Sequence, residues 1–188
     1  MMPRVGLNLE QIVQTAAEIA DNQGTEAVTL AGIARELSVR PPSLFNHVKG
    51  LPQIKRELSL LGVKKLFQRM NDATREKSGD EAIFAIANAY LQFTREHPGL
   101  YEYTIALPKP KDEEIERESN KILTLILTLF QSYPLSEENA IHAVRGFRSI
   151  LHGFSSLEQK GGFGMPIERN DSLHYMIRVF LAGLNKTE

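Results

Sequence analysis

The chain has 188 residues, of which 42% are hydrophobic and 24% charged, and it carries a formal net charge of -1 and no cysteine. These proportions belong to a globular protein and exclude a disordered or collagen-like chain. The lack of cysteine excludes a disulfide scaffold, a thiolate nucleophile and a Cys-ligated metal site. Because the sequence shows neither a secretory signal nor an apolar run of membrane-spanning length, we expect a cytoplasmic protein with no membrane partner.

Two short amphipathic helices are predicted first. Apolar residues recur every three or four positions over residues 9–20, which predicts one helix, and Gly24 is placed to end it. Thr29 is a good N-cap for a second helix over residues 30–37.

A third short helix follows a turn at residues 38–40. Pro41 and Pro42 open it, because the N–H group that proline lacks is not needed in a first helical turn. We expect this helix to extend to Val48.

The rest of the chain is predicted to form larger helices with short connections. Their expected ranges are 51–77, 80–97, 112–133, 136–160 and 170–184, with a short helical or irregular segment over 100–107. Ser136 is the expected N-cap of one of the last two helices, and Asn170, Asp171 or Ser172 that of the other. No strand-like alternation of useful length is present, so the fold class is all-α with about nine helices.

Residues 29–48 have the pattern of a helix-turn-helix, in which a turn of three or four residues joins two short helices. Ala34 is small where the helices must approach closely, and Ser38 stands in the turn, where glycine is more usual. The apolar residues that face the preceding helix are Ile33, Val39 and Leu44. We therefore expect an N-terminal three-helix domain over residues 1–50 and a C-terminal helical bundle over residues 51–188.

Positive charge gathers around this motif. Residues 35–69 contain eight basic and two acidic residues, a net charge of +6 in a chain whose total is -1. The basic residues are Arg35, Arg40, Lys49, Lys55, Arg56, Lys64, Lys65 and Arg69. Binding to DNA phosphates requires such a concentration of charge. Arg40 and Lys49 fit this role best, whereas the cations at 64, 65 and 69 are typical of an ordinary solvated helix face.

The segment SVRPPSLFNHVKG resembles the recognition segment of TetR-type repressors, and the likeness extends over AAEIADNQGTEAVTLAGIAREL. The segments REHPGLYEY and RSILHGFSSLEQKGGFG look like the regulatory domain of one subgroup of that family. The resemblance implies a bacterial transcription regulator, a repressor by family default. Such a protein would bind a palindromic double-stranded DNA operator as a homodimer and release it when an unknown small-molecule ligand binds.

The resemblance implies DNA-binding roles for the leading end of the third helix. Arg40 would read guanine, Pro41 and Pro42 would pack on thymine methyl groups, and Ser43 would face the bases with them. Thr29 would offer its hydroxyl and backbone N–H to a phosphate.

The end of the motif contributes the remaining expected DNA contacts. Phe45 stands where the family usually has a tyrosine, so the phosphate contact of that hydroxyl is in doubt. Asn46 would read adenine or bind the backbone, and His47 would donate to a phosphate or make a structural hydrogen bond. The family often has lysine where this chain has Leu51, so that phosphate anchor is either lost or moved to Lys49 or Lys55, and of these we expect Lys49.

The C-terminal bundle is expected to provide the dimer interface and a ligand pocket. The dimer candidates are Ala143, Gly146, Ile150, Gly153, Phe154, Leu157, Tyr175, Met176, Val179 and Phe180. The pocket candidates are Phe84, Tyr90, Phe93, Tyr101, Tyr103, Ile126, Phe130 and Phe147. For both sets the alternative is an ordinary intramolecular core.

Two other classes of protein remain as alternatives. No phosphate-binding loop, nucleophile elbow, dinucleotide fingerprint or zinc motif is present, so we expect no catalytic residue, no metal site and no cofactor. The alternatives are an enzyme without a recognisable motif and a helical adaptor that uses its helix-turn-helix for protein contacts.

Overall fold

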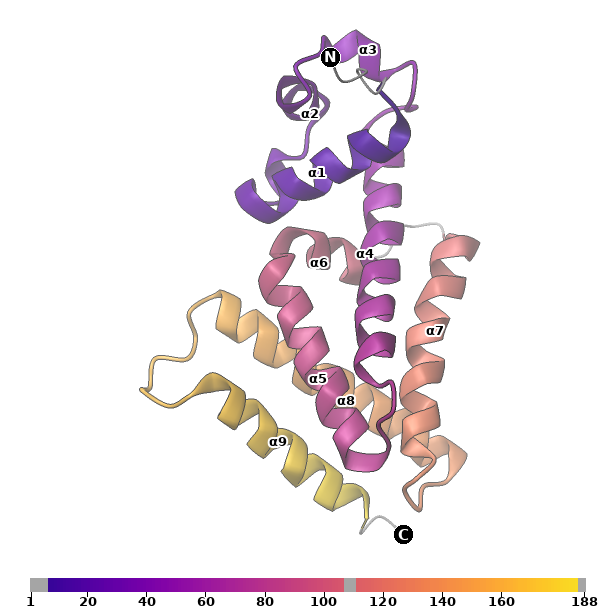
Figure 1. The fold of residues 1–188 in the computed structure, drawn as a ribbon, viewed down its shortest axis with the longest axis vertical. Helices are drawn as coiled ribbons and strands as arrows, with labels where there is room; N and C mark the ends of the chain where they lie inside the picture. Colours follow the sequence, from indigo (N-terminus) through magenta and orange to yellow (C-terminus); the bar gives the residue numbers. More distant parts are fainter. Residues whose placement is uncertain (1–6, 107–110, 186–188) are drawn as a thin grey trace. The chain divides into compact units, whose positions relative to one another are not determined.

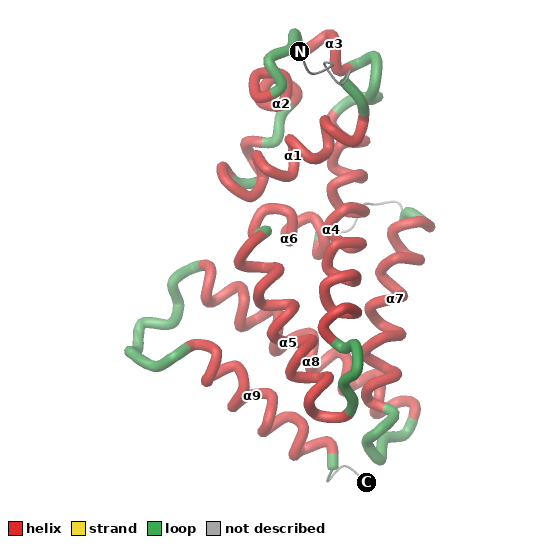
Figure 2. Tube along the Cα trace, viewed as in Figure 1, coloured by secondary structure: helices red, strands yellow, loops and turns green. Residues whose placement is uncertain are grey.

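The structure is a computed structural model that describes residues 7–106 and 111–185 (Figures 1 and 2). Within these ranges the chain forms nine α-helices and one 3-10 helix, and no strand, which confirms the expected all-α fold. None of the helices in the described ranges combines the length and the apolarity that crossing a membrane requires.

The helices follow one another with short connections (Figure 2). Their bounds are α1 Leu9–Gln23, η1 Thr25–Ala27, α2 Leu30–Glu36, α3 Pro41–Leu44, α4 Leu51–Ala73, α5 Gly79–Glu96, α6 Pro98–Ile105, α7 Glu113–Phe130, α8 Glu137–Gln159 and α9 Arg169–Leu184.

The chain divides into two compact units. The first unit comprises the chain up to Lys64 together with Glu96–Glu116, and the second comprises Lys65–Arg95 and the chain from Arg117 onward. Helices α1, α2, α3 and α6 therefore share the first unit with the start of α4. The predicted functional boundary after residue 50 stays a prediction, because compactness does not test where DNA binding ends.

Local signals place the first helices as expected. The Asn8 side chain accepts a hydrogen bond from the Gln11 N–H (2.8 Å) and caps α1, and Gly24 ends it with a φ of 86°. The hydroxyl of Thr29 accepts from the Gly32 N–H (2.9 Å), which confirms the predicted cap of α2.

Helix α6 packs against α1 in the first unit. One carboxylate oxygen of Asp21 accepts a hydrogen bond from the Leu100 N–H (2.8 Å), and the other lies 2.8 Å from Nδ1 of His97. A Cβ at Gly99 would lie 2.0 Å from the carbonyl oxygen of Ala20, so only glycine allows this approach. The segment expected over residues 100–107 is thus the helix α6, and Leu107 lies outside the described residues.

An aromatic cluster and an ion pair hold the second unit together. The rings of Phe130, Phe147 and Phe180 pack with centroids 5.8 to 6.2 Å apart and join α7, α8 and α9. Arg95 of α5 donates two hydrogen bonds to the half-buried Glu158 of α8, at 2.8 and 2.7 Å. Helices α8 and α9 pack on each other and are joined by the loop over residues 160–168 (Figure 1).

Four predicted helix ends differ from the structure. Helix α7 ends at Phe130 rather than at residue 133, because the Ser132 and Tyr133 N–H groups donate to carbonyl oxygens three residues back and form a turn. Helix α4 ends at Ala73 rather than near residue 77, because the next residues form tight turns that include Glu76 at a φ of 61°. Helix α9 begins one residue before the earliest predicted cap, because the Glu168 carboxylate accepts from the Asn170 N–H (3.4 Å). The predicted cap at Ser136 is confirmed. The third helix is also shorter than expected.

Candidate nucleic-acid interface

Helices α2 and α3 contact each other and enclose a tight turn (Figure 1). Ser38 in this turn has a φ of 54°, the left-handed conformation that explains why glycine is more usual there. The Val39 N–H donates to the carbonyl oxygen of Ala34 (2.9 Å), and Arg40 then returns to extended backbone ahead of α3. The chain therefore has the geometry of a helix-turn-helix.

Helix α3 ends at Leu44, whereas the sequence predicted a helix up to Val48. The Phe45 N–H donates to Pro42 (3.3 Å) and the His47 N–H donates to Leu44 (2.9 Å). These bonds span three residues rather than four, so the last turn tightens and Asn46 and His47 lie in a turn after the helix.

One side of α3 is buried and the other is open. Leu44 is fully buried and Val48 nearly so, and they anchor the segment. Of the nine residues expected to contact DNA, Ser43 alone is half-buried; those exposed are Thr29, Arg40, Pro41, Pro42, Phe45, Asn46, His47 and Lys49. Eight of the nine lie on α3 or beside it, and Thr29 caps α2. We call the exposed residues 40–49 the reading edge.

The cations of this region fall into two kinds. Arg40, Lys49 and Lys55 are exposed and form no ion pair with any residue that the structure describes. The backbone N–H of Lys49 donates to Oε1 of Gln53 (2.7 Å), which ties the end of the reading edge to α4. These three side chains are available to phosphates.

Arg56, in contrast, is held by carboxylates at the start of α7. Its Nε lies 2.8 Å from Oδ2 of Asp112 and its Nη2 lies 2.7 Å from Oε2 of Glu114. Lys64 also approaches Glu114, at 3.2 Å. We call these four residues the α4–α7 latch. The hydrogen bonds from Arg56 lower the pKa of Asp112 to about 2, and the same bonds raise the pKa of Arg56.

The latch was not predicted from the sequence. The available signal was a run of acidic residues at 112–114, opposite in sign to the basic stretch at 35–69, but acidic residues at a helix start are also typical of a favourable interaction with the helix dipole. Asp112 also accepts from the Glu114 and Ile115 N–H groups (3.0 and 3.1 Å), so it both caps α7 and binds Arg56.

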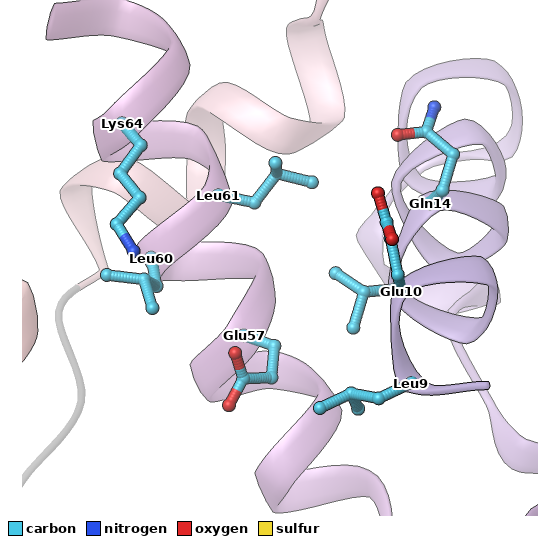
Figure 3. Close-up of a pocket in the computed structure, with 8 residues that line it drawn as sticks. Leu9, Glu10, Gln14, Glu57, Leu60, Leu61 and Lys64 are labelled. Carbon is cyan, nitrogen blue, oxygen red and sulfur yellow. The ribbon is translucent and has the colours of Figure 1, made fainter. Parts of the chain in front are cut away.

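A groove of about 410 Å³ lies between α1 and α4 in the first unit (Figure 3). Leucine side chains of both helices form its apolar wall, and Glu57 and Lys64 stand at its edge. Both charges are paired, Glu57 with Arg56 (2.8 Å) and Lys64 with Glu114 (3.2 Å). The Glu10 carboxylate at its edge has no ion pair with the residues described.

The eight pocket candidates divide between the two units. Tyr101 and Tyr103 lie on α6 in the first unit. The others lie in the second unit and are Phe84, Tyr90, Phe93, Ile126, Phe130 and Phe147. All except Phe84 are buried. The Tyr103 hydroxyl has no hydrogen-bond partner among the described residues, and burial raises its pKa. Which of the eight line a pocket stays a prediction.

The ten dimer candidates differ in exposure. Ala143 and Phe154 are buried within their own unit, and a Cβ at Gly146 would meet the ring of Phe180 at 3.2 Å. Ile150 and Gly153 are half-buried. Those with exposed side chains are Leu157 at 53%, Tyr175 at 64%, Met176 at 40% and Val179 at 57%.

Comparison with known protein families gives a match over the second half of the chain. The family model described as the tetracyclin repressor-like C-terminal domain matches residues 83–180. The chain is also 45% identical over 185 residues to YobS, an uncharacterised HTH-type transcriptional regulator of Bacillus subtilis, covering 98% of this chain and 96% of that one. It is 30% identical to the HTH-type regulator Rv0681 of Mycobacterium tuberculosis, covering 82% of this chain and 72% of that one.

Solved structures share the fold. A protein of unknown function from Rhodococcus sp. RHA1 superimposes with a TM-score of 0.85 at 17% identity, covering 99% of this chain and 100% of that one. SCO7222, a TetR from Streptomyces coelicolor, gives a TM-score of 0.70 at 15% identity, covering 96% of this chain and 98% of that one. At such identities the likeness concerns the fold.

Proposed function

This chain belongs to the TetR family of helix-turn-helix transcriptional regulators, and we propose that it is a repressor that binds a palindromic operator as a homodimer and releases it when a small molecule binds. Because operator DNA lies in the bacterial cytoplasm, we infer that the protein acts there. The observation that carries the proposal is the reading edge, which is exposed and cationic on one side and anchored by buried Leu44 on the other.

The reading edge offers two kinds of DNA contact. Arg40 carries a forked guanidinium with no acidic partner among the described residues, which suits the two acceptors of guanine in the major groove. Lys49, at the end of the reading edge, and Lys55, beyond it on α4, also have no acidic partner among the described residues. They suit phosphates, whose neutralisation releases counterions. Phe45 is 58% exposed and has no hydroxyl, so it would pack on a sugar or a thymine methyl rather than bind a phosphate.

A dimer follows from the length of DNA that must be read. One helix-turn-helix contacts only a few base pairs, and two-fold dimers of such proteins place two motifs about 34–36 Å apart. Tyr175, Met176 and Val179 lie on one face of α9 and expose large apolar surface, as Leu157 does on α8. Exposed apolar patches of this kind mark interaction surfaces. We therefore narrow the proposed interface to these four residues and the half-buried Ile150 and Gly153 of α8.

Selection of bound duplexes from a random DNA pool tests the proposal. We expect an enriched palindrome whose half-site centres are about 10 base pairs apart, one helical turn. An unenriched pool would contradict sequence-specific DNA binding, and an enriched but asymmetric sequence would contradict the two-fold dimer.

The dimer has its own test in sedimentation. We expect Val179→Asp to produce monomers, because a carboxylate would be buried without a partner. Thr128→Asp, which changes an exposed residue of α7, is the matched control and should leave the assembly unchanged. A wild-type chain that is monomeric at micromolar concentration would refute the proposed interface.

A further inference from the structure

A second groove lies between α4 and α7, within the second unit. Its volume is about 390 Å³, in the range of small-molecule sites, about 300–1,000 Å³. The residues that matter for its chemistry are Phe67, Asn71, Arg117, Asn120, Lys121 and Leu125.

The polar side chains of this groove are largely unpaired. Arg117, Asn71 and Asn120 make no side-chain hydrogen bond or ion pair with any part of the chain that the structure describes. The groove between α1 and α4 differs, because its lysine and one of its two glutamates are paired. An unpaired guanidinium beside two free amides leaves donors available to a ligand.

The charge of the groove indicates which ligand these donors suit. The ammonium of Lys121 lies 2.8 Å from both carboxylate oxygens of Glu118, so this pair is neutral, and Arg117 leaves one net positive charge. One net positive charge matches a carboxylate, which carries a single negative charge, better than a doubly charged phosphate. The guanidinium also matches the two oxygens of a carboxylate in geometry.

The floor of the groove is apolar. Phe67 and Leu125 are half-buried and contribute a ring and an isobutyl group. The Lys121 ammonium stands 5.8 Å from the centroid of the Phe67 ring, so the ring lies beside the charged rim. A ligand held by Arg117 would therefore lay an apolar body along this floor.

From this arrangement we propose that the α4–α7 groove binds an amphiphilic carboxylate, an organic acid with one charge and an aromatic or aliphatic body. The inference rests on the proposed function only where it makes this acid the effector. Both helices that line the groove also contribute residues to the first unit, α4 through Leu51 to Lys64 and α7 through Glu113 to Glu116. The two helices that line the groove are therefore the same two helices that the latch joins within the first unit.

Calorimetry of the full chain tests the binding with 2-naphthoate as the probe. The uncharged 2-naphthamide, which has the same ring system, is the control ligand. We expect naphthoate to bind and naphthamide to bind at least about tenfold more weakly, because the charged hydrogen bonds to Arg117 are lost. Arg117→Ala should weaken naphthoate binding by a similar factor. Arg148→Ala, which removes an exposed arginine of α8 in the same unit, should change nothing.

A second variant separates loss of charge from loss of fold. Thr124→Trp fills the groove from an exposed position without removing a charge, and it should abolish naphthoate binding while the melting temperature stays unchanged. Equal binding of naphthoate and naphthamide, equal binding by the Arg117 and Arg148 variants, or no binding at millimolar naphthoate would each overturn the proposal.

The effector role is tested separately on DNA. Naphthoate should release the wild-type chain from its selected operator and should fail to release the Arg117→Ala variant. If the wild-type chain binds no operator, the proposed function fails, while the calorimetry still decides the groove. Binding of naphthoate without release of DNA would keep the site and refute its effector role.

Discussion

Lys55 and Arg56 are neighbours in the chain, yet they belong to different electrostatic environments. Lys55 is exposed and without an acidic partner among the described residues, as Arg40 and Lys49 are, whereas Arg56 is bound by Asp112 and others of the latch. Successive side chains on a helix point about 100° apart, so two neighbouring cations in the sequence can face different surfaces of the protein. A formal charge of +6 over residues 35–69 therefore overstates the charge available to DNA.

The two kinds of cation differ in the free energy with which they would bind a phosphate. A free surface cation can bind a DNA phosphate at little cost, and the counterions that the DNA then releases favour binding. A cation already held by carboxylates must first lose those hydrogen bonds. The reading edge is thus suited to DNA, and the latch to holding α4 and the start of α7 together within the first unit.

The largest expected effect separates the buried side of α3 from its exposed side. Leu44→Ala should lower the free energy of unfolding by about 2–5 kcal/mol, because Leu44 is fully buried and its truncation leaves a cavity. Phe45→Ala, at a side chain that is 58% exposed, should change it by no more than about 0.5 kcal/mol. Denaturant unfolding measures both. Equal losses would mean that Phe45 is part of the core and that the reading edge is wrongly placed.

A smaller effect is expected for base recognition. Arg40→Ala should weaken binding to the selected operator by about 1–3 kcal/mol and relax the preference at one base pair, since a bidentate contact to guanine is lost. Binding assays on a set of operators with single substitutions measure this. Lys111→Ala, at a side chain 86% exposed in the first unit, is the control. A loss that is the same on every operator would make Arg40 a phosphate contact instead.

The smallest expected effect is on the contribution of the latch to stability at low pH. The pKa of Asp112 is lowered from 3.8 to about 2 in the folded chain, so its contribution to stability is complete above pH 3.8 and is lost as the pH falls toward 2. Asp112→Asn should remove this part of the acid sensitivity. Thermal unfolding between pH 4 and pH 2 should therefore show a shallower decline for the variant. If the melting temperatures of both proteins fall equally steeply with pH, Asp112 is not held by Arg56 in solution.

The sequence predicted features that depend on a few neighbouring residues. The cap at Thr29, the helix end at Gly24 and the cap at Ser136 were all correct, because each is decided within about four residues. The position of Ser38 in the turn was also foreseen, and its positive φ explains the family's preference for glycine there.

Features that depend on distant partners were missed. The ion pair of Arg56 with Asp112 joins residues 56 positions apart, and nothing in the local pattern of either residue indicates it. The sequence also did not indicate that Tyr101 and Tyr103 belong to a different unit from the other pocket candidates, because periodicity shows that a residue is buried but not against which helix. Whether they line a pocket stays a prediction. The packing of α6 on α1, through Gly99 and Asp21, places both tyrosines in the first unit.

The salt dependence of operator binding tests the central claim most directly, in the wild type, Lys49→Ala and Arg56→Ala. For the wild type, the logarithm of the affinity should fall linearly with the logarithm of the salt concentration. Lys49→Ala should reduce that slope by about 0.9, the value for one phosphate contact, and Arg56→Ala should leave it unchanged. A wild-type affinity that does not respond to salt, or a slope that Arg56→Ala reduces and Lys49→Ala does not, would contradict the assignment of DNA binding to the reading edge.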